Sequence, residues 1–263
     1  MTEKPNIIDP SALVKPCGIQ AFREAEDTFT MCRRLGQIGV IVGTTGTGKT
    51  TAAKAHAEGN KASTVYMRLP IVANTPQPFL VRLCRAAGCD YAPNMGKAEL
   101  SEELVICLRA TPGMLVIIDE ANHLTADLVH IVREIWDEAR CGFVLVGTPE
   151  MEALWAERRG RRGVGDGFAA FRARIGQRLP MPKPSAEDVK ALCQHMGLSG
   201  KREHDLIARC LKGGIGLHNL EQLLTNARLA AGEGEVVTAD HLFLASTMLA
   251  GPESPAASLA EAR

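Results

Sequence analysis

The stretch VIVGTTGTGKTTA, residues 40–52, carries three apolar residues into a loop of glycine and threonine. It fits the pattern G-x-x-x-x-G-K-[ST], in which a tight loop joins a buried strand to a helix. An apolar run, residues 38–42, leads into the loop, and an alanine-rich run with helical spacing, residues 50–58, follows it. The stretch therefore predicts a phosphate-binding loop inside a strand, loop and helix unit.

The residue types in this loop suit a nucleoside triphosphate. Glycines let the backbone fold around phosphates with its N–H groups pointing inward, and the start of the helix adds partial positive charge. The Lys49 ammonium would reach the β- and γ-phosphates, and the Thr50 hydroxyl would bind Mg²⁺. The predicted nucleotide-binding residues are Gly43, Thr44, Thr45, Gly46, Thr47, Gly48, Lys49, Thr50 and Thr51.

Strands and helices alternate along the first two thirds of the chain. Apolar runs typical of buried strands occupy residues 38–42, 63–69, 114–119 and 142–147. Segments with helical periodicity lie before, between and after them. This alternation predicts an α/β fold in which a mostly parallel sheet is sandwiched between layers of helices.

The pattern changes at a group of prolines, Pro180, Pro182 and Pro184, which cannot belong to a central strand or a helix interior. Ser185 and Asp188 then form a helix start that resembles a capping box. Only helical periodicity follows, which predicts a small all-helical domain. The expected organisation is an irregular arm at residues 1–18, a core domain at 19–182, a helical domain at 183–250 and a flexible tail at 251–263.

Two acidic residues close the apolar run at residues 114–119. Asp119 comes at the carboxyl end of the predicted strand, where open parallel sheets present their ligands, and Glu120 is next. In hydrolysis, one carboxylate serves Mg²⁺ while its neighbour orients and polarises the attacking water. Asp119 is therefore the expected metal ligand, and Glu120 the expected catalytic residue.

Thr148 follows the next apolar run, in the sequence VLVGTPE. A small polar side chain at this point can hydrogen-bond the γ-phosphate or the lytic water and so report which nucleotide is bound. The alternative is a simple turn residue before Pro149.

Composition indicates a soluble, folded protein with balanced charge. The 263 residues are 46% hydrophobic, and 30 basic side chains cancel 30 acidic ones, so an anionic partner must be met by a local patch. Eight cysteines without any Cys-x-x-Cys pair favour reduced core residues in a reducing cytoplasm over a metal site or disulfides. No leader peptide is evident and no stretch approaches ~18 uninterrupted apolar residues, so we expect neither export nor a membrane span.

Three motifs together carry a family resemblance: GTTGTGKTTA at residues 43–52, VIIDEANHL at 116–124 and VLVGTPEM at 144–151. In this order, followed by helices, they resemble the AAA+ ATPases, and within that class the transposition ATPases typified by the phage Mu B protein. The resemblance covers residues 20–250. It implies an ATP-dependent DNA-binding protein that assembles as a helical oligomer on DNA, chooses the insertion target and stimulates a partner transposase.

The resemblance also implies roles for individual residues. Lys49 and Thr50 would serve the phosphates and Mg²⁺, Asp119 and Glu120 the metal and hydrolysis, and Thr148 would be the first sensor. The helical domain at residues 183–250 would correspond to the lid domain of AAA+ proteins.

AAA+ assemblies also use an arginine finger from a neighbouring subunit, placed near the end of the helix before the last sheet strand. The sequence FRARIGQRL, residues 171–179, offers Arg172, Arg174 and Arg178. Arg174, directly before an apolar residue, matches best. Such a residue stabilises charge on the γ-phosphate and makes hydrolysis depend on assembly. A surface ion pair is the alternative for any of the three.

Two features depart from the family pattern. Where many AAA+ proteins place an arginine of the lid as a second sensor, this chain has His218 and Asn219. The phage Mu B protein carries a DNA-binding domain before its ATPase part. The segment before the first predicted strand here, about 35 residues, is expected to be too short for such a domain. We therefore expect DNA contacts from the ATPase domain itself.

Positive charge is concentrated between residues 158 and 178, which hold seven arginines and one acid, a local charge of +6. Such an excess is the electrostatic footprint of a polyanion. The glycine-rich sequence RRGRRGVGDG supplies the predicted DNA-binding residues, which are Arg158, Arg159, Arg161 and Arg162. Weaker candidates on other loops are Lys61, Arg68 and Lys97. Without interleaved aromatic residues, we expect contact with the phosphate backbone of duplex DNA and little base readout; a solvated loop or a subunit contact is the alternative.

The leading hypothesis is an ATPase, with ATP and Mg²⁺ as cofactors, that forms a helical filament or ring on double-stranded DNA and activates a transposase. A helicase loader or initiator-type AAA+ ATPase of DNA replication would share the site chemistry and is the alternative. A secretion-associated ATPase would bring a membrane segment. A small-molecule kinase would need a substrate pocket and a closing lid of its own.

Overall fold

The computed structural model describes residues 19–151, 171–195, 198, 200–212, 217–232 and 235–249. These residues form two compact units. The sheet unit consists of residues 23–44, 52–151 and 171–182. The helical unit holds the described residues from 183 onward, together with residues 19–22 and 45–51.

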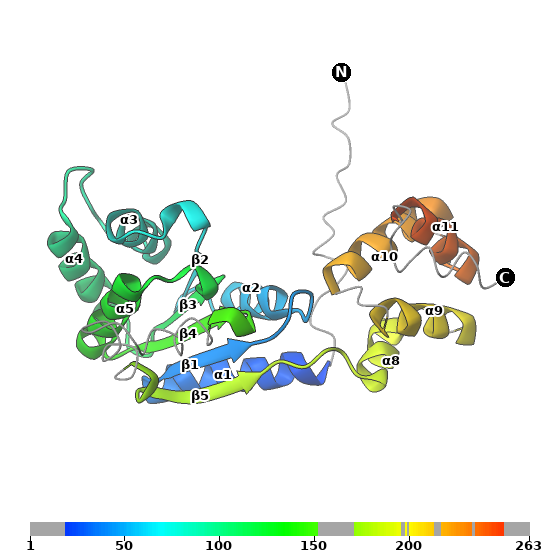
Figure 1. Ribbon diagram of the computed structural model, residues 1–263, viewed down its shortest axis with the longest axis horizontal. Coiled ribbons are helices and arrows are strands. Elements are labelled where there is room, and N and C mark those ends of the chain that lie inside the picture. The colour runs from blue at the N-terminus through cyan, green and yellow to red at the C-terminus, as the bar shows by residue number, and fades with distance from the viewer. Residues whose placement is uncertain are drawn as a thin grey trace, which may run out of the picture. The chain divides into compact units, whose positions relative to one another are not determined.

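The sheet unit is built on five strands that all run parallel (Figure 1). In chain order they are β1 (Ile38–Val42), β2 (Thr64–Arg68), β3 (Leu115–Asp119), β4 (Gly142–Gly147) and β5 (Ile175–Pro180). Their order across the sheet is β2-β3-β4-β1-β5. Because the strands are parallel, their carboxyl ends meet at one edge, and every loop after a strand begins there.

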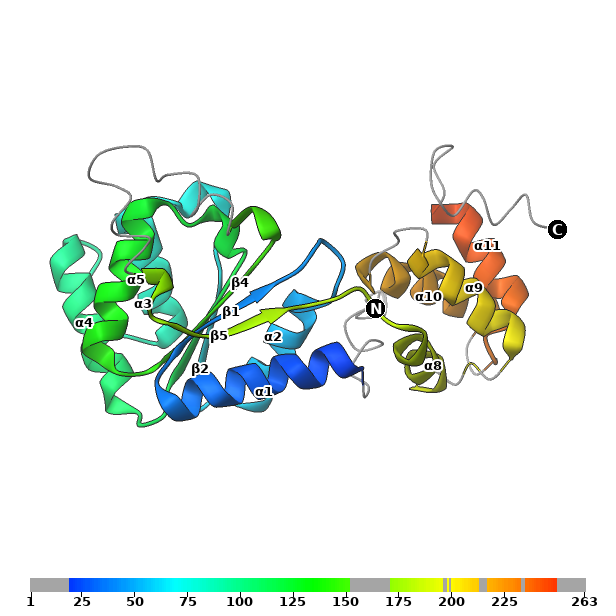
Figure 2. The same cartoon turned by 60° about the horizontal axis from the view of Figure 1, so that its bottom comes forward.

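Helices cover both faces of this sheet. The helices are α1 (Gln20–Leu35), α2 (Lys49–Gly59), α3 (Pro76–Ala87), α4 (Lys97–Ala110) and α5 (Ala126–Ala139). Figure 2 shows α1 and α2 along one face and α3, α4 and α5 on the other. Two single 3-10 turns, η2 (Ile71–Ala73) and η3 (Ala121–His123), follow β2 and β3. The predicted α/β sandwich is confirmed.

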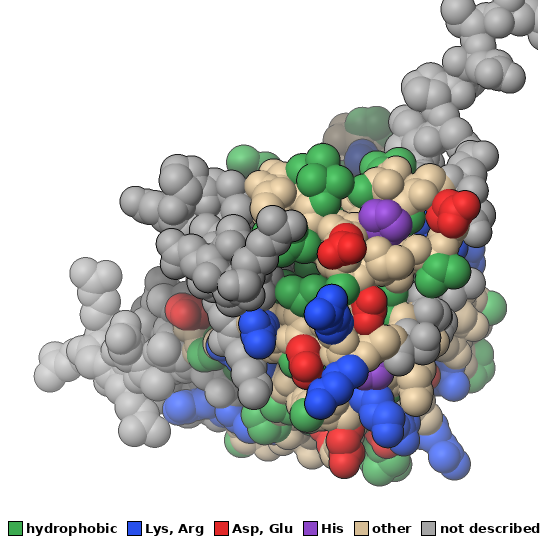
Figure 3. All heavy atoms as spheres, turned by 90° about the vertical axis from the view of Figure 1, so that its right-hand side faces the viewer, with side chains coloured by type: hydrophobic (Ala, Val, Ile, Leu, Met, Phe, Trp, Pro, Cys, Tyr) green, Lys and Arg blue, Asp and Glu red, His purple; other side chains and the backbone are tan. Residues whose placement is uncertain are grey.

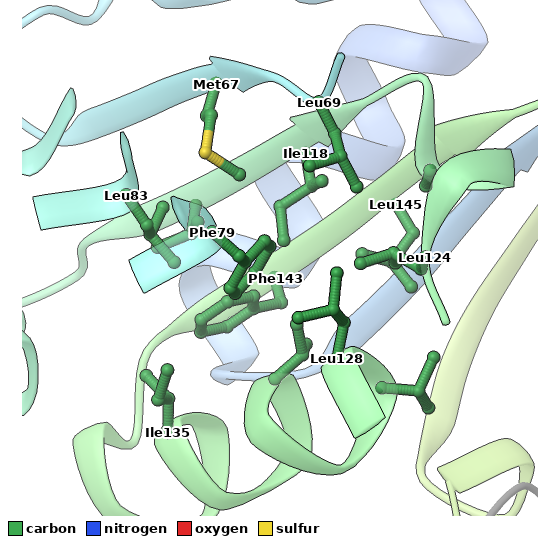
Figure 4. Packing of buried hydrophobic residues seen from close by; sticks show 14 of the residues in the cluster. Met67, Leu69, Phe79, Leu83, Ile118, Leu124, Leu128, Ile135, Phe143 and Leu145 are labelled. Atoms are coloured by element: carbon green, nitrogen blue, oxygen red, sulfur yellow. The ribbon is translucent and has the colours of Figure 1, made fainter. Parts of the chain in front are cut away.

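The main core lies between the sheet and helices α3 to α5. Alternate residues of neighbouring strands, such as Ile118 and Phe143, point to this side and meet Phe79 of α3 and Leu128 of α5 (Figure 4). All four side chains are fully buried. At roughly 1.5–3 kcal/mol for each large apolar side chain removed from water, this contact layer is a main stabilising term of the sheet unit.

Burial differs between central and edge strands. Every residue of β1, β3 and β4 is buried, as expected for strands covered on both faces. The edge strand β5 alternates between half-buried and exposed residues. It ends at Pro180, which lacks a backbone donor and is tolerated at a sheet edge.

In the described part beyond Pro182, regular structure is helical: α8 (Ala186–His195), α9 (Lys201–Lys212), α10 (Leu217–Ala231) and α11 (Ala239–Leu249). The predicted capping box begins α8, since Asp188 donates its N–H to Ser185 Oγ (3.1 Å) and accepts the Ser185 N–H at Oδ2 (2.8 Å). Asp188 Oδ1 also accepts the Gln20 N–H (2.8 Å).

On the face shown in Figure 3, basic side chains are interspersed with acidic ones.

All seven described cysteines are free thiols. Five are buried, and Cys89 and Cys107 are half-buried. None of the helices in the described ranges is long and apolar enough to cross a lipid bilayer.

Candidate nucleotide-binding site

The carboxyl edge of the sheet brings together the ends of three strands that precede predicted site residues. Val42 at the end of β1 is in register with Gly147 of β4, and Asp119 at the end of β3 is in register with Val146. The Gly43 N–H donates to the Gly147 carbonyl (3.2 Å), so the loop after β1 starts beside the end of β4.

The loop itself adopts a conformation that requires glycine. Gly46 and Gly48 have φ values of 84° and 90°, a region that residues with a Cβ rarely enter. Helix α2 begins at Lys49 and carries Thr50 and Thr51 in its first turn. Lys49 is 9% exposed, and its Nζ donates to Thr47 Oγ1 (3.5 Å). A buried lysine in the first turn of a helix is suited to a phosphate, because the helix N-terminus also carries partial positive charge.

Asp119 is 2% exposed and accepts hydrogen bonds at both carboxylate oxygens. Oδ1 accepts the Glu120 N–H (2.9 Å), and Oδ2 accepts the hydroxyl of Tyr66 on β2 (2.9 Å). The two hydrogen bonds, one on each oxygen, fix the orientation of the carboxylate.

Tyr66 is a partner that the sequence analysis missed. Burial, followed by the nearby Asp119 carboxylate, raises the pKa of Tyr66 far above its usual value. Its hydroxyl therefore stays protonated and remains a donor. The sequence gives one weak signal for this contact. Tyr66 and Asp119 lie on two different predicted strands, and their side chains can share a face once these strands pair.

Glu120 combines an unusual backbone with an ion pair. Its φ of 56° and ψ of 39° lie in the left-handed region, where non-glycine residues are uncommon. Its Oε1 lies 3.0 Å from Nη2 of Arg68, whose side chain is 64% exposed. Strained residues of this kind cluster at functional sites, and an exposed ion pair constrains the carboxylate only weakly.

Thr148 directly follows β4 and is half-buried, with its carbonyl accepting the Met151 N–H (3.0 Å). Asn122 lies nearby, since a Cβ on Gly147 would meet its amide oxygen at 3.4 Å. Within the described structure that oxygen is buried and accepts no hydrogen bond. An unsatisfied acceptor at the strand edge is suited to a donor that arrives with a ligand.

The three arginine-finger candidates differ in their surroundings. Arg174 directly precedes β5, and its Nε donates to Asp137 Oδ1 of α5 (3.4 Å). The two side chains are 35% and 45% exposed. In the isolated chain Arg174 therefore forms a partly exposed ion pair, which was the alternative to an arginine finger. Arg172 is half-buried, and Arg178 is exposed on β5.

The predicted DNA-binding residues Arg158, Arg159, Arg161 and Arg162 lie outside the described residues. The weaker candidates Lys61, Arg68 and Lys97 are all exposed. His218 and Asn219 belong to the first turn of α10.

The donor set fits Mg²⁺ better than a resident structural metal. The described residues contain no group of three or more His, Cys, Asp or Glu side chains that could hold a metal ion. The buried carboxylate of Asp119 is a hard oxygen group of the kind with which proteins bind Mg²⁺ together with substrate phosphates.

Comparison with known proteins assigns both parts of the chain. Residues 32–154 match the family model of an AAA domain, and residues 173–249 match that of the Mu B transposition protein, C terminal. The chain is thus Mu B-like over both its AAA domain and its C-terminal part. The predicted family resemblance is confirmed.

Among Mu B relatives, the ATP-dependent target DNA activator B of Escherichia phage Mu is 32% identical over 206 residues. The match covers 78% of this chain and 64% of the phage protein. The Mu-like prophage FluMu DNA transposition protein B of Haemophilus influenzae is 25% identical over 181 residues, which are 69% of this chain and 61% of that protein. The chain thus spans less than two thirds of the length of these relatives.

Solved structures show the fold of this Mu B-type chain in other proteins. Cdc6p from Pyrobaculum aerophilum superimposes with a TM-score of 0.65 at 14% identity, covering 92% of this chain and 71% of that one. The RuvB Holliday junction branch migration motor of Thermotoga maritima gives 0.53 at 15% identity, with coverages of 87% and 68%.

Proposed function

We propose that this chain is an ATP-dependent ATPase that oligomerises on double-stranded DNA, selects target DNA and activates a partner transposase. The observation that carries the proposal is the match of one chain to both an AAA domain and the Mu B C-terminal domain. A relative with 32% identity is named an ATP-dependent target DNA activator, which supports the same assignment.

Each residue at the strand edge then has a defined task. The Lys49 ammonium and the loop N–H groups hold the phosphates, and Thr50 and Asp119 hold Mg²⁺ when it is bound. The metal would neutralise charge on the phosphates. Glu120 accepts a proton from the attacking water, and Thr148 hydrogen-bonds the γ-phosphate or that water.

Arg174 links hydrolysis to assembly in this proposal. Its pair with Asp137 is partly exposed, and such pairs contribute only ~0–1 kcal/mol. Arg174 can therefore exchange Asp137 for the γ-phosphate of a neighbouring subunit at little cost. Nucleotide bound at the subunit junction would then stabilise the oligomer.

The DNA contact is proposed for the arginine-rich loop at residues 158–162. A chain with no net charge needs a local patch to attract a polyanion, and the strongest local excess in the sequence lies here. Phosphate contact without base readout suits a protein that must accept many target sequences.

The test is binding to duplexes of several sequences over a range of salt concentrations, with and without ATP and Mg²⁺. We expect tight binding only with ATP. Lys49→Ala should abolish this ATP-dependent binding. Alanine at the four loop arginines should weaken binding to every sequence and reduce the log–log salt slope by up to about 4, roughly one unit per lost phosphate contact.

The matched control removes the same charge from four exposed arginines on other elements: Arg34, Arg82, Arg202 and Arg209. It should leave the salt slope close to that of the wild type. An unchanged slope in the loop variant would remove the loop from the DNA path. Stimulation of strand transfer by a transposase separates a target activator from a helicase loader, which would not support it.

A further inference from the structure

Asp119 is held from two directions. The turn that follows its own strand contributes the Glu120 N–H to Oδ1, and the neighbouring strand β2 contributes the Tyr66 hydroxyl to Oδ2, each at 2.9 Å. A carboxylate with one donor on each oxygen has both its position and the orientation of its plane defined. One acceptor site on each oxygen remains for other ligands.

The pairing of β2 with β3 explains why a tyrosine performs this task. Tyr66 is in register with Ile117, and Asp119 lies two residues further along the same face. The long aromatic side chain of Tyr66 spans this diagonal, as its 2.9 Å hydrogen bond to Asp119 shows. The tyrosine hydroxyl thus reaches the metal-ligand position from a residue that is not itself at the strand edge.

We propose that Tyr66 is a positioning residue that fixes the Asp119 carboxylate for the magnesium nucleotide. The inference rests on the proposed function, because it requires Asp119 to serve Mg²⁺. The Tyr66 hydroxyl donates to Asp119 Oδ2 and prevents the carboxylate from rotating. Asp119 then meets a hydrated metal without reorganising, and groups that orient metal ligands in this way strongly influence affinity.

The surroundings of Tyr66 allow a conservative test. Tyr66 is half-buried, and its ring borders a surface hollow that is also lined by Lys54, Ala57, Glu58, Lys61 and Thr64. Tyr66→Phe therefore keeps the ring in place and removes only the hydroxyl. The chain has just two tyrosines, so Tyr91→Phe is a matched control. Tyr91 Oη accepts a hydrogen bond from Nη2 of exposed Arg85 (3.4 Å).

The experiment measures binding of a fluorescent ATP analogue to the full chain at increasing Mg²⁺ concentration and in chelator. For Tyr66→Phe we expect the Mg²⁺ midpoint to rise about 10-fold, the lower end of the usual range for groups that orient metal ligands. Affinity in chelator should stay at the wild-type level. Tyr91→Phe should match the wild type in both conditions.

Thermal unfolding supplies a second readout. The increase in midpoint temperature on adding ATP with Mg²⁺, relative to ATP with chelator, should shrink in Tyr66→Phe. A merely structural role would lower all midpoints equally and leave this difference intact, which would overturn the inference, as would an unchanged Mg²⁺ midpoint. A wild-type chain that binds ATP without any dependence on Mg²⁺ would instead refute the proposed function.

Discussion

Glu120 shows how much of the site depends on single residues. Its position after a buried strand predicts a catalytic carboxylate, and the structure places it at the strand edge beside Arg68. Its left-handed backbone was not predictable, because φ at a residue with a Cβ is imposed by the packing around the turn into η3.

Buried thiols give a residue-scale prediction about stability at high pH. Burial raises the pKa of Cys32 and that of Cys141 to about 12. The unfolded chain ionises its thiols near pH ~8.5, so the unfolded state loses protons first as the pH rises. The free energy of unfolding should therefore stay constant below pH ~8.5. Between that pH and pH 12 it should fall by up to about 1.4 kcal/mol per pH unit for each thiol.

Urea unfolding at pH 8, 9 and 10 checks this expectation. A variant with Cys32→Ala and Cys141→Ala should be less stable at pH 8 but should lose stability more slowly as the pH rises. Parallel curves for the wild type and this variant would show that the two thiols do not titrate differently in the folded and unfolded chain.

Tyr66 marks the limit of residue-level reasoning from sequence. The carboxylate it contacts was predicted as a metal ligand, but its own role was not. A cross-strand hydrogen bond depends on which strands are neighbours and in what register. Neither is encoded locally, because 53 residues separate Tyr66 from Asp119.

At the scale of elements, hydrophobic periodicity was a reliable guide wherever an element is fully buried. The strands expected at residues 38–42 and 142–147 are confirmed with the same bounds. The helical periodicity expected after Pro184 also corresponds to helices in the described residues. The strand β5 is not among the apolar runs from which strands were predicted. Only alternate residues of this edge strand face inward, and Gln177 and Arg178 interrupt any apolar run.

The contact between α1 and β4 gives an element-scale prediction. A Cβ on Gly142 would lie 2.5 Å from the Cys32 carbonyl oxygen and 2.9 Å from Arg33 Cα, both backbone atoms of α1. Gly142→Ala must therefore push the helix away from the start of β4. We expect a loss on the order of 3 kcal/mol in the free energy of unfolding, measured with urea.

Gly59→Ala is the matched control for Gly142→Ala. A Cβ on Gly59, the last residue of α2, meets no atom within 4 Å. Because alanine is a better helix former than glycine, this change should leave stability unchanged or raise it by up to about 1 kcal/mol. Equal losses in both variants would contradict the assigned contact.

At the scale of the whole molecule, the sequence motifs were sufficient to predict the α/β class and the family, because three separate motifs mark three strand ends of one sheet. The match of residues 173–249 to the Mu B C-terminal domain adds information that helical periodicity alone does not contain. Assembly cannot be derived from one chain, since an arginine finger acts on a neighbouring subunit.

The central claim is that ATP bound at the junction between subunits holds many copies together on duplex DNA. Glu120→Gln tests it most directly, because this change removes the proposed proton acceptor for hydrolysis and leaves the proposed phosphate-binding residues in place. The measurement is electron microscopy of this variant with ATP, Mg²⁺ and a long duplex, with Lys49→Ala as the control. We predict stable filaments for Glu120→Gln and none for Lys49→Ala. A Glu120→Gln protein that remains monomeric and off the DNA under these conditions would contradict the account.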